Sequence, residues 1–177
     1  MKKVFVGKRL WIVLFVFLPF MAFISFDWVT TSIDERASVD FPAAPDKQDV
    51  QGNAVLTANG DKSKYVAVAF DFGKFGADSA MMAAELDKPE MMDQVKNGIM
   101  GELKGSTLVS EKDTLTNGYR TFEFIFDIPE SDSVGLNRMH SKTVFVAAKM
   151  YSLSFIEDKD APKEADRRKF FNSLKIK

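Results

Sequence analysis

The uncharged run from Leu10 to Phe26 constrains this chain more than any other feature. Its 17 residues include one polar side chain, Ser25. As a helix they would extend about 25 Å, close to the roughly 30 Å hydrocarbon core of a bilayer. Trp28 follows the run, where an indole ring suits the membrane–water interface. Because the run is apolar on every side, it is typical of a membrane-spanning helix rather than of a helix buried along one face.

Two interpretations of this run are open: an anchor that stays in the membrane, or a signal peptide that is cleaved. A cleavage site needs small residues in an A-x-A-like pattern. From Ala22 to Trp28 the sequence is AFISFDW, in which no two residues spaced two apart are both small. We therefore favour an uncleaved anchor over a cleaved signal. A pilin-like N-terminus is disfavoured because the run has no acidic residue near its start.

The charges before the run predict its orientation. Four basic residues lie within the first nine positions, and basic flanks of membrane helices stay in the cytoplasm. We expect residues 1–28 to form a cytoplasmic basic stub and a transmembrane anchor, residues 29–38 to form a polar tether, and residues 39–177 to form an extracytoplasmic domain. In a bacterium this arrangement predicts a single-pass protein of the inner membrane with a periplasmic C-terminal domain.

Charge and cysteine content exclude several classes of function. Four of the 24 basic residues and one of the 25 acidic residues precede residue 30, so residues 30–177 carry a net charge of −4. An acidic domain is a poor match for phosphate backbones, and no nucleic-acid partner is expected. The chain has no cysteine, which excludes disulfides, thiol catalysis and thiolate metal sites.

Beyond the tether, six segments have the alternating apolar residues of β-strands. Two pairs of them are separated by an Asn-Gly dipeptide, a strong signal for a tight hairpin turn. The turns are expected at Asn59-Gly60 and at Asn117-Gly118. The strands are expected at residues 53–58, 64–72, 107–115, 119–128, 143–147 and 151–156.

Two stretches have helical periodicity. Between Met91 and Leu103 an apolar residue recurs every fourth position, so this stripe is expected to lie on the sheet. The proline of Asp87-Lys88-Pro89 interrupts the pattern and predicts two helical segments or one kinked helix within residues 77–103. A final helix is expected at residues 161–174, capped by Asp160. Hairpin strands with packed helices indicate an α+β domain with a single, mainly antiparallel sheet.

The order of these elements resembles the PsbP-like family over roughly residues 38–177. The stretches that carry the resemblance are FPAAP, KYVAVAFDF, NGYRTFEF, KTVFVAAKMYSLSF and FFNSLKI. Gly118-Tyr119-Arg120 stands where the family usually has Gly-Tyr-Pro-Gly-Arg. The family includes lumenal proteins of the photosystem and a nuclear-import factor that binds the GTPase Ran. The resemblance implies the family's fold and a binding or assembly role, and no metal-associated residues of the family find a match.

Residues that suggest chemistry each have a simpler structural interpretation. His140 is the only histidine, and its neighbours Arg138 and Lys142 would lower its pKa, so a surface histidine is favoured over a metal or catalytic role. Asp127, Glu130 and Asp132 would offer oxygen ligands to calcium, but a solvated acidic turn is favoured. For GKFGADS at residues 73–79, a strand-to-helix connection with Asp78 near the cap is favoured over an anion-binding loop. RTFEFIFD is read as a core strand.

Five of the nine methionines lie between residues 81 and 100, where helical spacing makes core packing the default. Met81 and Met82 precede the break in the helix, so they are the better candidates for contact with a partner. No cofactor and no metal site are expected.

The sequence thus predicts a membrane-anchored, extracytoplasmic, non-enzymatic accessory domain that contacts a partner protein or a membrane complex. The alternative is a domain that binds a small ligand or lipid in a groove between helix and sheet. A hydrolase using Asp71 and Glu123 has no support from their spacing and is not expected.

Overall fold

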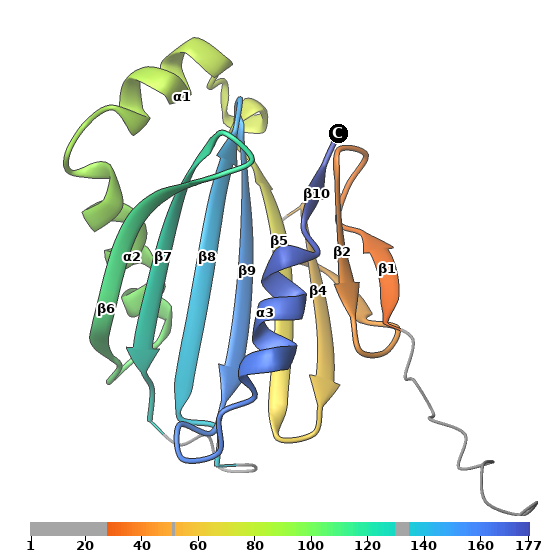
Figure 1. Cartoon of the computed structure of the whole chain (residues 1–177). Coiled ribbons are helices and arrows are strands. Elements are labelled where there is room, and N and C mark those ends of the chain that lie inside the picture. Colours follow the sequence, from red (N-terminus) through yellow and green to blue (C-terminus); the bar gives the residue numbers. More distant parts are fainter. Residues whose placement is uncertain (1–27, 51, 130–134) are drawn as a thin grey trace, which may run out of the picture.

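A computed structural model describes residues 28–50, 52–129 and 135–177 (Figure 1). Within these ranges the chain forms α-helices, one short 3-10 helix (η1) and β-strands that pair only antiparallel. The elements in chain order are β1 (Val29–Ser32), β2 (Ala37–Phe41), β3 (Asp46–Val50), β4 (Asn53–Gly60), β5 (Ser63–Asp71), η1 (Phe72–Phe75), α1 (Ser79–Leu86), α2 (Met91–Glu102), β6 (Thr107–Thr116), β7 (Tyr119–Asp127), β8 (Arg138–Val146), β9 (Lys149–Glu157), α3 (Glu164–Asn172) and β10 (Lys175–Ile176).

The strands form two sheets, so the expected α+β class is confirmed but the expected single sheet is wrong. Seven strands make the larger sheet in the order β3-β4-β5-β9-β8-β7-β6, and the smaller sheet has the order β1-β2-β10. The predicted anchor, Leu10 to Phe26, lies outside the described residues. Among the residues that are described, no helix has both the length and the apolar character needed to cross a membrane.

The second sheet contains most of the segment that was expected to be a polar tether. Residues 29–32 pair with β2, and Ile33 and Ala37 are buried in the core. The Asp34 carboxylate accepts hydrogen bonds from Lys149 Nζ at 2.8 Å and from the Tyr151 hydroxyl at 3.0 Å. Val29 at the start of the segment is exposed, but the strand pairing, the buried Ile33 and Ala37 and the contacts of Asp34 with β9 make residues 29–38 part of the fold.

One predicted hairpin turn is confirmed and the other is displaced. Asn117 and Gly118 connect β6 to β7 with φ angles of 53° and 84°, as a two-residue turn requires. In the other hairpin the strands continue through Asn59-Gly60, and the turn is formed by Asp61 and Lys62. Gly60 serves close packing instead, because a Cβ there would lie 2.9 Å from the Tyr65 ring.

Both predicted helical regions exist. The C-terminal helix, α3, is shorter than the predicted range of residues 161–174. The first breaks into α1 and α2 around Pro89 as expected, and its apolar stripe packs on a cluster that includes Phe122 and Phe124. The last helix begins at Glu164, and Asp160 does not cap it. The Glu157 carboxylate accepts the N–H of Lys163, the residue before the helix, at 2.5 Å.

The larger sheet is covered on both faces, but on different strands. Figure 1 shows α2 and α3 on opposite faces. On one face α1 and α2 pack over phenylalanines of β7 and β8. On the other face α3 and the smaller sheet pack over β4, β5 and β9 through a cluster that includes Phe41, Tyr65 and Phe170. On this second face, no element of the described residues covers β6, β7 and much of β8 beside α3.

Candidate functional site

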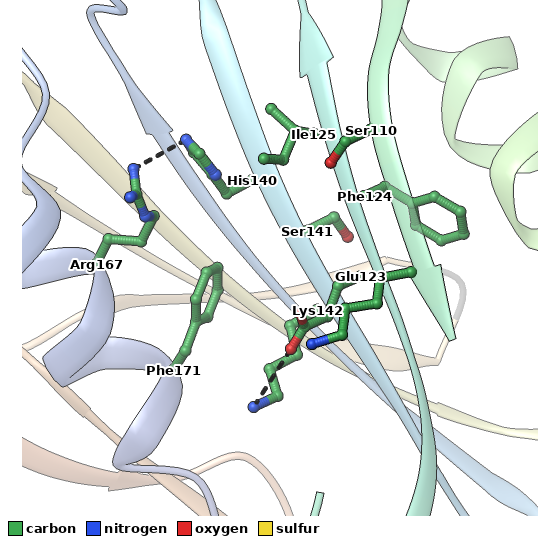
Figure 2. A pocket seen from close by; sticks show the side chains of 10 residues that line it. Ser110, Glu123, Phe124, Ile125, His140, Ser141, Lys142, Arg167 and Phe171 are labelled. Atoms are coloured by element: carbon green, nitrogen blue, oxygen red, sulfur yellow. Dashed lines mark hydrogen bonds and ion pairs between the residues drawn. The ribbon is translucent and has the colours of Figure 1, made fainter. Parts of the chain in front are cut away.

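A groove of about 290 Å³ lies where α3 stops covering the sheet, over β6, β7 and β8 (Figure 2). Side chains from the three strands form its floor, and α3 forms one wall. Figure 2 shows His140 and Arg167 facing each other at one end, with Lys142 and Glu123 together at the other. The side chains that matter for its chemistry are Lys112, Glu123, Ile125, His140, Lys142, Arg167 and Phe171.

Strand register explains why these residues meet. The phenylalanines of RTFEFIFD face α2, so Glu123 and Ile125 between them face the groove. Glu123 lies opposite Lys112 on β6 and opposite Lys142 on β8. Ile125 lies opposite His140 in the next row. The pattern that predicted a core strand thus also places a row of charged residues on the other side of the sheet.

The inner end of the groove is held by the buried carboxylate of Glu157. Its side chain is 1% exposed and contacts both His140 and Arg167. The guanidinium donates to Glu157 Oε1, which also lies 2.9 Å from His140 Nε2. Arg167 Nη1 lies 3.0 Å from the same imidazole nitrogen. Arginine only donates and a carboxylate only accepts, so Nε2 can satisfy one of them at a time.

These surroundings lower the pKa of His140 to about 4. Burial is the largest cause, since it disfavours the charged imidazolium, and the positive charge of Arg167 adds to it. The Glu157 carboxylate acts in the opposite direction but is outweighed. His140 is therefore a neutral, half-buried side chain at neutral pH and not the surface histidine that the sequence suggested. Its sequence neighbour Arg138 makes only a minor contribution.

Within residues 28–50, 52–129 and 135–177, Lys142 at the outer end has no acidic partner at hydrogen-bond distance. Its side chain is 11% exposed, and the nearest carboxylate oxygen, on Glu123, is 3.9 Å from Nζ. Burial lowers the pKa of Lys142, Glu123 raises it and the neighbouring Lys112 lowers it further. The groove therefore contains a partly buried ammonium group that has no hydrogen-bonded carboxylate among the described residues.

A second hollow, of about 390 Å³, lies on the opposite face between α2 and the sheet. Its lining is mostly apolar, with Met91, Val95 and Ile99 from α2 and Met150 from β9. A groove between helix and sheet was the site expected for the alternative ligand-binding function, and this hollow occupies that position.

The two methionines proposed for partner contact lie in different environments. Met81 is 55% exposed on α1. Met82 is 5% exposed and packs in the same cluster as Met91, so it has no surface to offer a partner. A contact role remains a prediction for Met81 alone.

The other sequence candidates have structural roles where they are described. Asp127 binds Arg138 at 2.8 Å, which lowers the pKa of its carboxyl group, while Glu130 and Asp132 lie outside the described residues. Asp78 accepts the Met81 N–H at 2.8 Å and caps α1, as predicted. In the part of the chain that is described, no three histidine, aspartate or glutamate side chains are grouped to hold a metal ion.

Asp71 and Glu123, the carboxylates considered for hydrolysis, are not brought together. Asp71 accepts the Gly73 N–H at 2.9 Å and caps η1. It lies on β5, and two strands separate β5 from β7, which carries Glu123.

The partnership of Glu157 with Arg167 was not found from the sequence. One signal was present, because Arg167 precedes Phe170 and Phe171 by three and four residues and so shares their helix face. That spacing places the guanidinium toward the sheet. Nothing local identifies Glu157 as the carboxylate that meets it.

Comparison with solved structures identifies the fold. The chain is similar to the solution structure of cyanobacterial PsbP (CyanoP) from Synechocystis sp. PCC 6803, with a TM-score of 0.53 at 11% identity, covering 85% of this chain and 92% of that one. The chain therefore has a PsbP-like fold, as the order of elements predicted. A protein from Bacteroides thetaiotaomicron VPI-5482 gives a TM-score of 0.35 at 10% identity, covering 80% of this chain and 45% of that one. No protein-family model and no curated protein matches the sequence.

Proposed function

We propose that this protein is a non-enzymatic accessory domain that binds a partner protein outside the cytoplasm, held at a bacterial inner membrane by Leu10 to Phe26. The observation that carries the proposal is the groove beside α3, where partly buried charges face an opening of side-chain size. The PsbP-like fold supports it, because the resemblance in sequence implies a binding or assembly role.

The chemistry of the groove favours binding over catalysis. A general base needs a free nitrogen lone pair within reach of a substrate proton. His140 Nε2 is in contact with both Glu157 and Arg167, so this nitrogen is not free to accept a substrate proton. The lysines and Glu123 at the other end can pair with complementary charges on a partner protein, which would give the contact specificity.

Site-directed photocrosslinking in intact membranes tests the proposal. Benzoylphenylalanine in place of Ser110, which lines the groove, is expected to give one defined adduct with a partner protein. The control position is Val50, which is exposed on β3 at the opposite edge of the sheet. The absence of an adduct from Ser110, or equal adducts from both positions, would contradict the proposal.

Fractionation tests the anchor separately. The full chain is expected to remain with membranes after washing at high salt and alkaline pH. A soluble mature chain that begins near residue 27 or beyond would contradict the anchor and support cleavage.

The hollow under α2 favours a second candidate function, the binding of a small apolar ligand or lipid chain. Gly98 lines this hollow and has open space where a Cβ would be, so Gly98→Phe is expected to fill it. Gly101 on the same helix also has open space but does not line the hollow, which makes Gly101→Phe the matched control. Native mass spectrometry should show a bound ligand lost only in Gly98→Phe. A ligand-free wild-type protein would contradict this function.

A further inference from the structure

We infer that the groove beside α3 recognises a carboxylate on an acidic side chain of the partner protein, next to an apolar side chain, with Lys142 Nζ as its hydrogen-bond donor. The inference rests on the proposed function and names the chemistry that the partner presents.

Two other lysines that are about as buried as Lys142 each have carboxylate partners. The comparison supports the inference that Lys142 binds an anion supplied by another molecule. Lys96 and Lys149 each have side chains 16% exposed, and each Nζ has two carboxylate oxygens within 2.8 Å. Lys142 is slightly less exposed, and its nearest carboxylate is 3.9 Å away. A desolvated ammonium gains most from an ionised acceptor at about 2.7 to 2.9 Å, which a carboxylate entering the groove would supply.

The net charge of the groove also favours binding of an anion. Arg167 is matched by the buried Glu157, and His140 is neutral at neutral pH, so neither changes the balance. Lys112 and Lys142 then share one lining carboxylate, that of Glu123. The groove carries a net positive charge in a domain whose overall charge is negative, so it attracts an anion.

The kind of anion follows from the same residues. The charge of Arg167 is matched by the buried Glu157 carboxylate, which its Nη1 contacts, so Arg167 adds little net charge for holding a dianion such as phosphate. Glu123 would repel a dianion more strongly than a carboxylate. Ile125 and Phe171 supply apolar surface beside Lys142, which suits an apolar side chain adjoining the acid. A groove of about 290 Å³ accepts one or two side chains and not a helix.

Peptide titration of the full-length protein in detergent micelles tests the inference by amide NMR. The probe is acetyl-Phe-Asp-amide, and its neutral match is acetyl-Phe-Asn-amide. The aspartate peptide is expected to shift amides of β7, β8 and α3 saturably, and the asparagine peptide is not. Lys142→Met keeps the aliphatic stem and should weaken binding at least tenfold, because a hydrogen bond to a charged group is lost. The control Lys47→Met, on exposed β3, should bind as wild type does.

Glu123→Gln provides a second, independent variant. It removes the carboxylate that competes for Lys142, so the aspartate peptide should bind several-fold more tightly. Equal shifts from both peptides, or unchanged affinity in both Lys142→Met and Glu123→Gln, would overturn the inference. Phenylacetate serves as a small free acid for comparison. If it binds these residues more tightly than the aspartate peptide does, the ligand is a small free acid, and the inference that a partner protein supplies the carboxylate is overturned.

The crosslink from Ser110 separates this inference from the proposed function. If Lys142→Met still gives the partner adduct while no carboxylate binds, the recognition chemistry is wrong and the accessory function stands. If wild-type protein gives no adduct in membranes but binds the peptide, the partner-binding function is wrong.

Discussion

Three polar groups converge on the buried carboxylate of Glu157. It accepts the Lys163 N–H and the Arg167 guanidinium, and it contacts the His140 imidazole. These contacts join the last residue of β9 to the start of α3 and to the first part of β8. Glu157 therefore positions one wall of the groove as well as stabilising the fold.

Glu157→Gln is expected to destabilise the protein by about 3 kcal/mol or more, because it leaves the partly buried Arg167 without a countercharge. Urea unfolding at pH 7 would measure the loss. Glu164→Gln on the same helix is the control, since its ion pair with Arg168 is exposed and should contribute less than about 0.5 kcal/mol. Equal losses in the two variants would show that Glu157 is not held as described.

His140 predicts a pH dependence of stability. Its pKa in the folded protein is about 4, below the ordinary value of 6.5, because burial and the charges of Arg167 and Arg138 outweigh Glu157. The unfolded chain therefore binds the proton first as the pH falls. Stability is fully present above about pH 6.5 and should fall by on the order of 3 kcal/mol toward pH 4.

Thermal melts of wild type and His140→Gln between pH 7 and pH 4 measure this effect. The variant has no imidazole to protonate, so its melting temperature should change less over this range. Parallel curves for the two proteins would assign the pH dependence to other groups.

At the scale of elements, Phe170 is the buried residue through which α3 docks on the core. Phe170 is fully buried, and its ring centroid lies 5.4 Å from that of Phe41 and 5.2 Å from that of Tyr65. Phe170→Ala should therefore cost about 3 to 5 kcal/mol of stability, measured by urea unfolding. Phe75, which is 70% exposed, gives the control, and Phe75→Ala should cost less than about 1 kcal/mol. Similar losses would mean that α3 is not docked through Phe170.

The elements that could be predicted from sequence are those set by near neighbours. The Asn117-Gly118 turn and the break at Pro89 depend on local backbone preferences, and both exist as expected. The prediction of a turn at Asn59-Gly60 was wrong, because both residues pair within the strands. Gly60 lies where a Cβ would be 2.9 Å from the Tyr65 ring.

The site could be predicted only in part, for the same reason. Alternation placed the phenylalanines of β7 in the core and so implied that Glu123 faces outward. It did not identify the residues that meet there from distant parts of the chain. Lys142, His140 and Arg167 come together through strand pairing and helix docking, which no local pattern records.

At the scale of the whole molecule, the smaller sheet is a layer that the core requires. Its strand β2 contributes Val39 and Phe41 to the cluster under α3, and Ile33 and Ala37 adjoin them. A chain that begins at Trp28 should therefore keep cooperative thermal unfolding. A chain that begins at Asp46 lacks this layer and should lose it. Cooperative melting of the shorter chain at a similar temperature would show that the smaller sheet is dispensable.

The pairing of β10 with β2 also sets when this fold can be completed. Ile176 lies opposite Ala37, and the Lys177 N–H binds the Arg36 carbonyl at 2.9 Å. A ribosome makes β2 long before it makes β10, so the pairing of these two strands cannot form until translation has passed residue 176. Contacts this distant in sequence also form slowly. The smaller sheet therefore lacks one of its three strands until the end of the chain has been made.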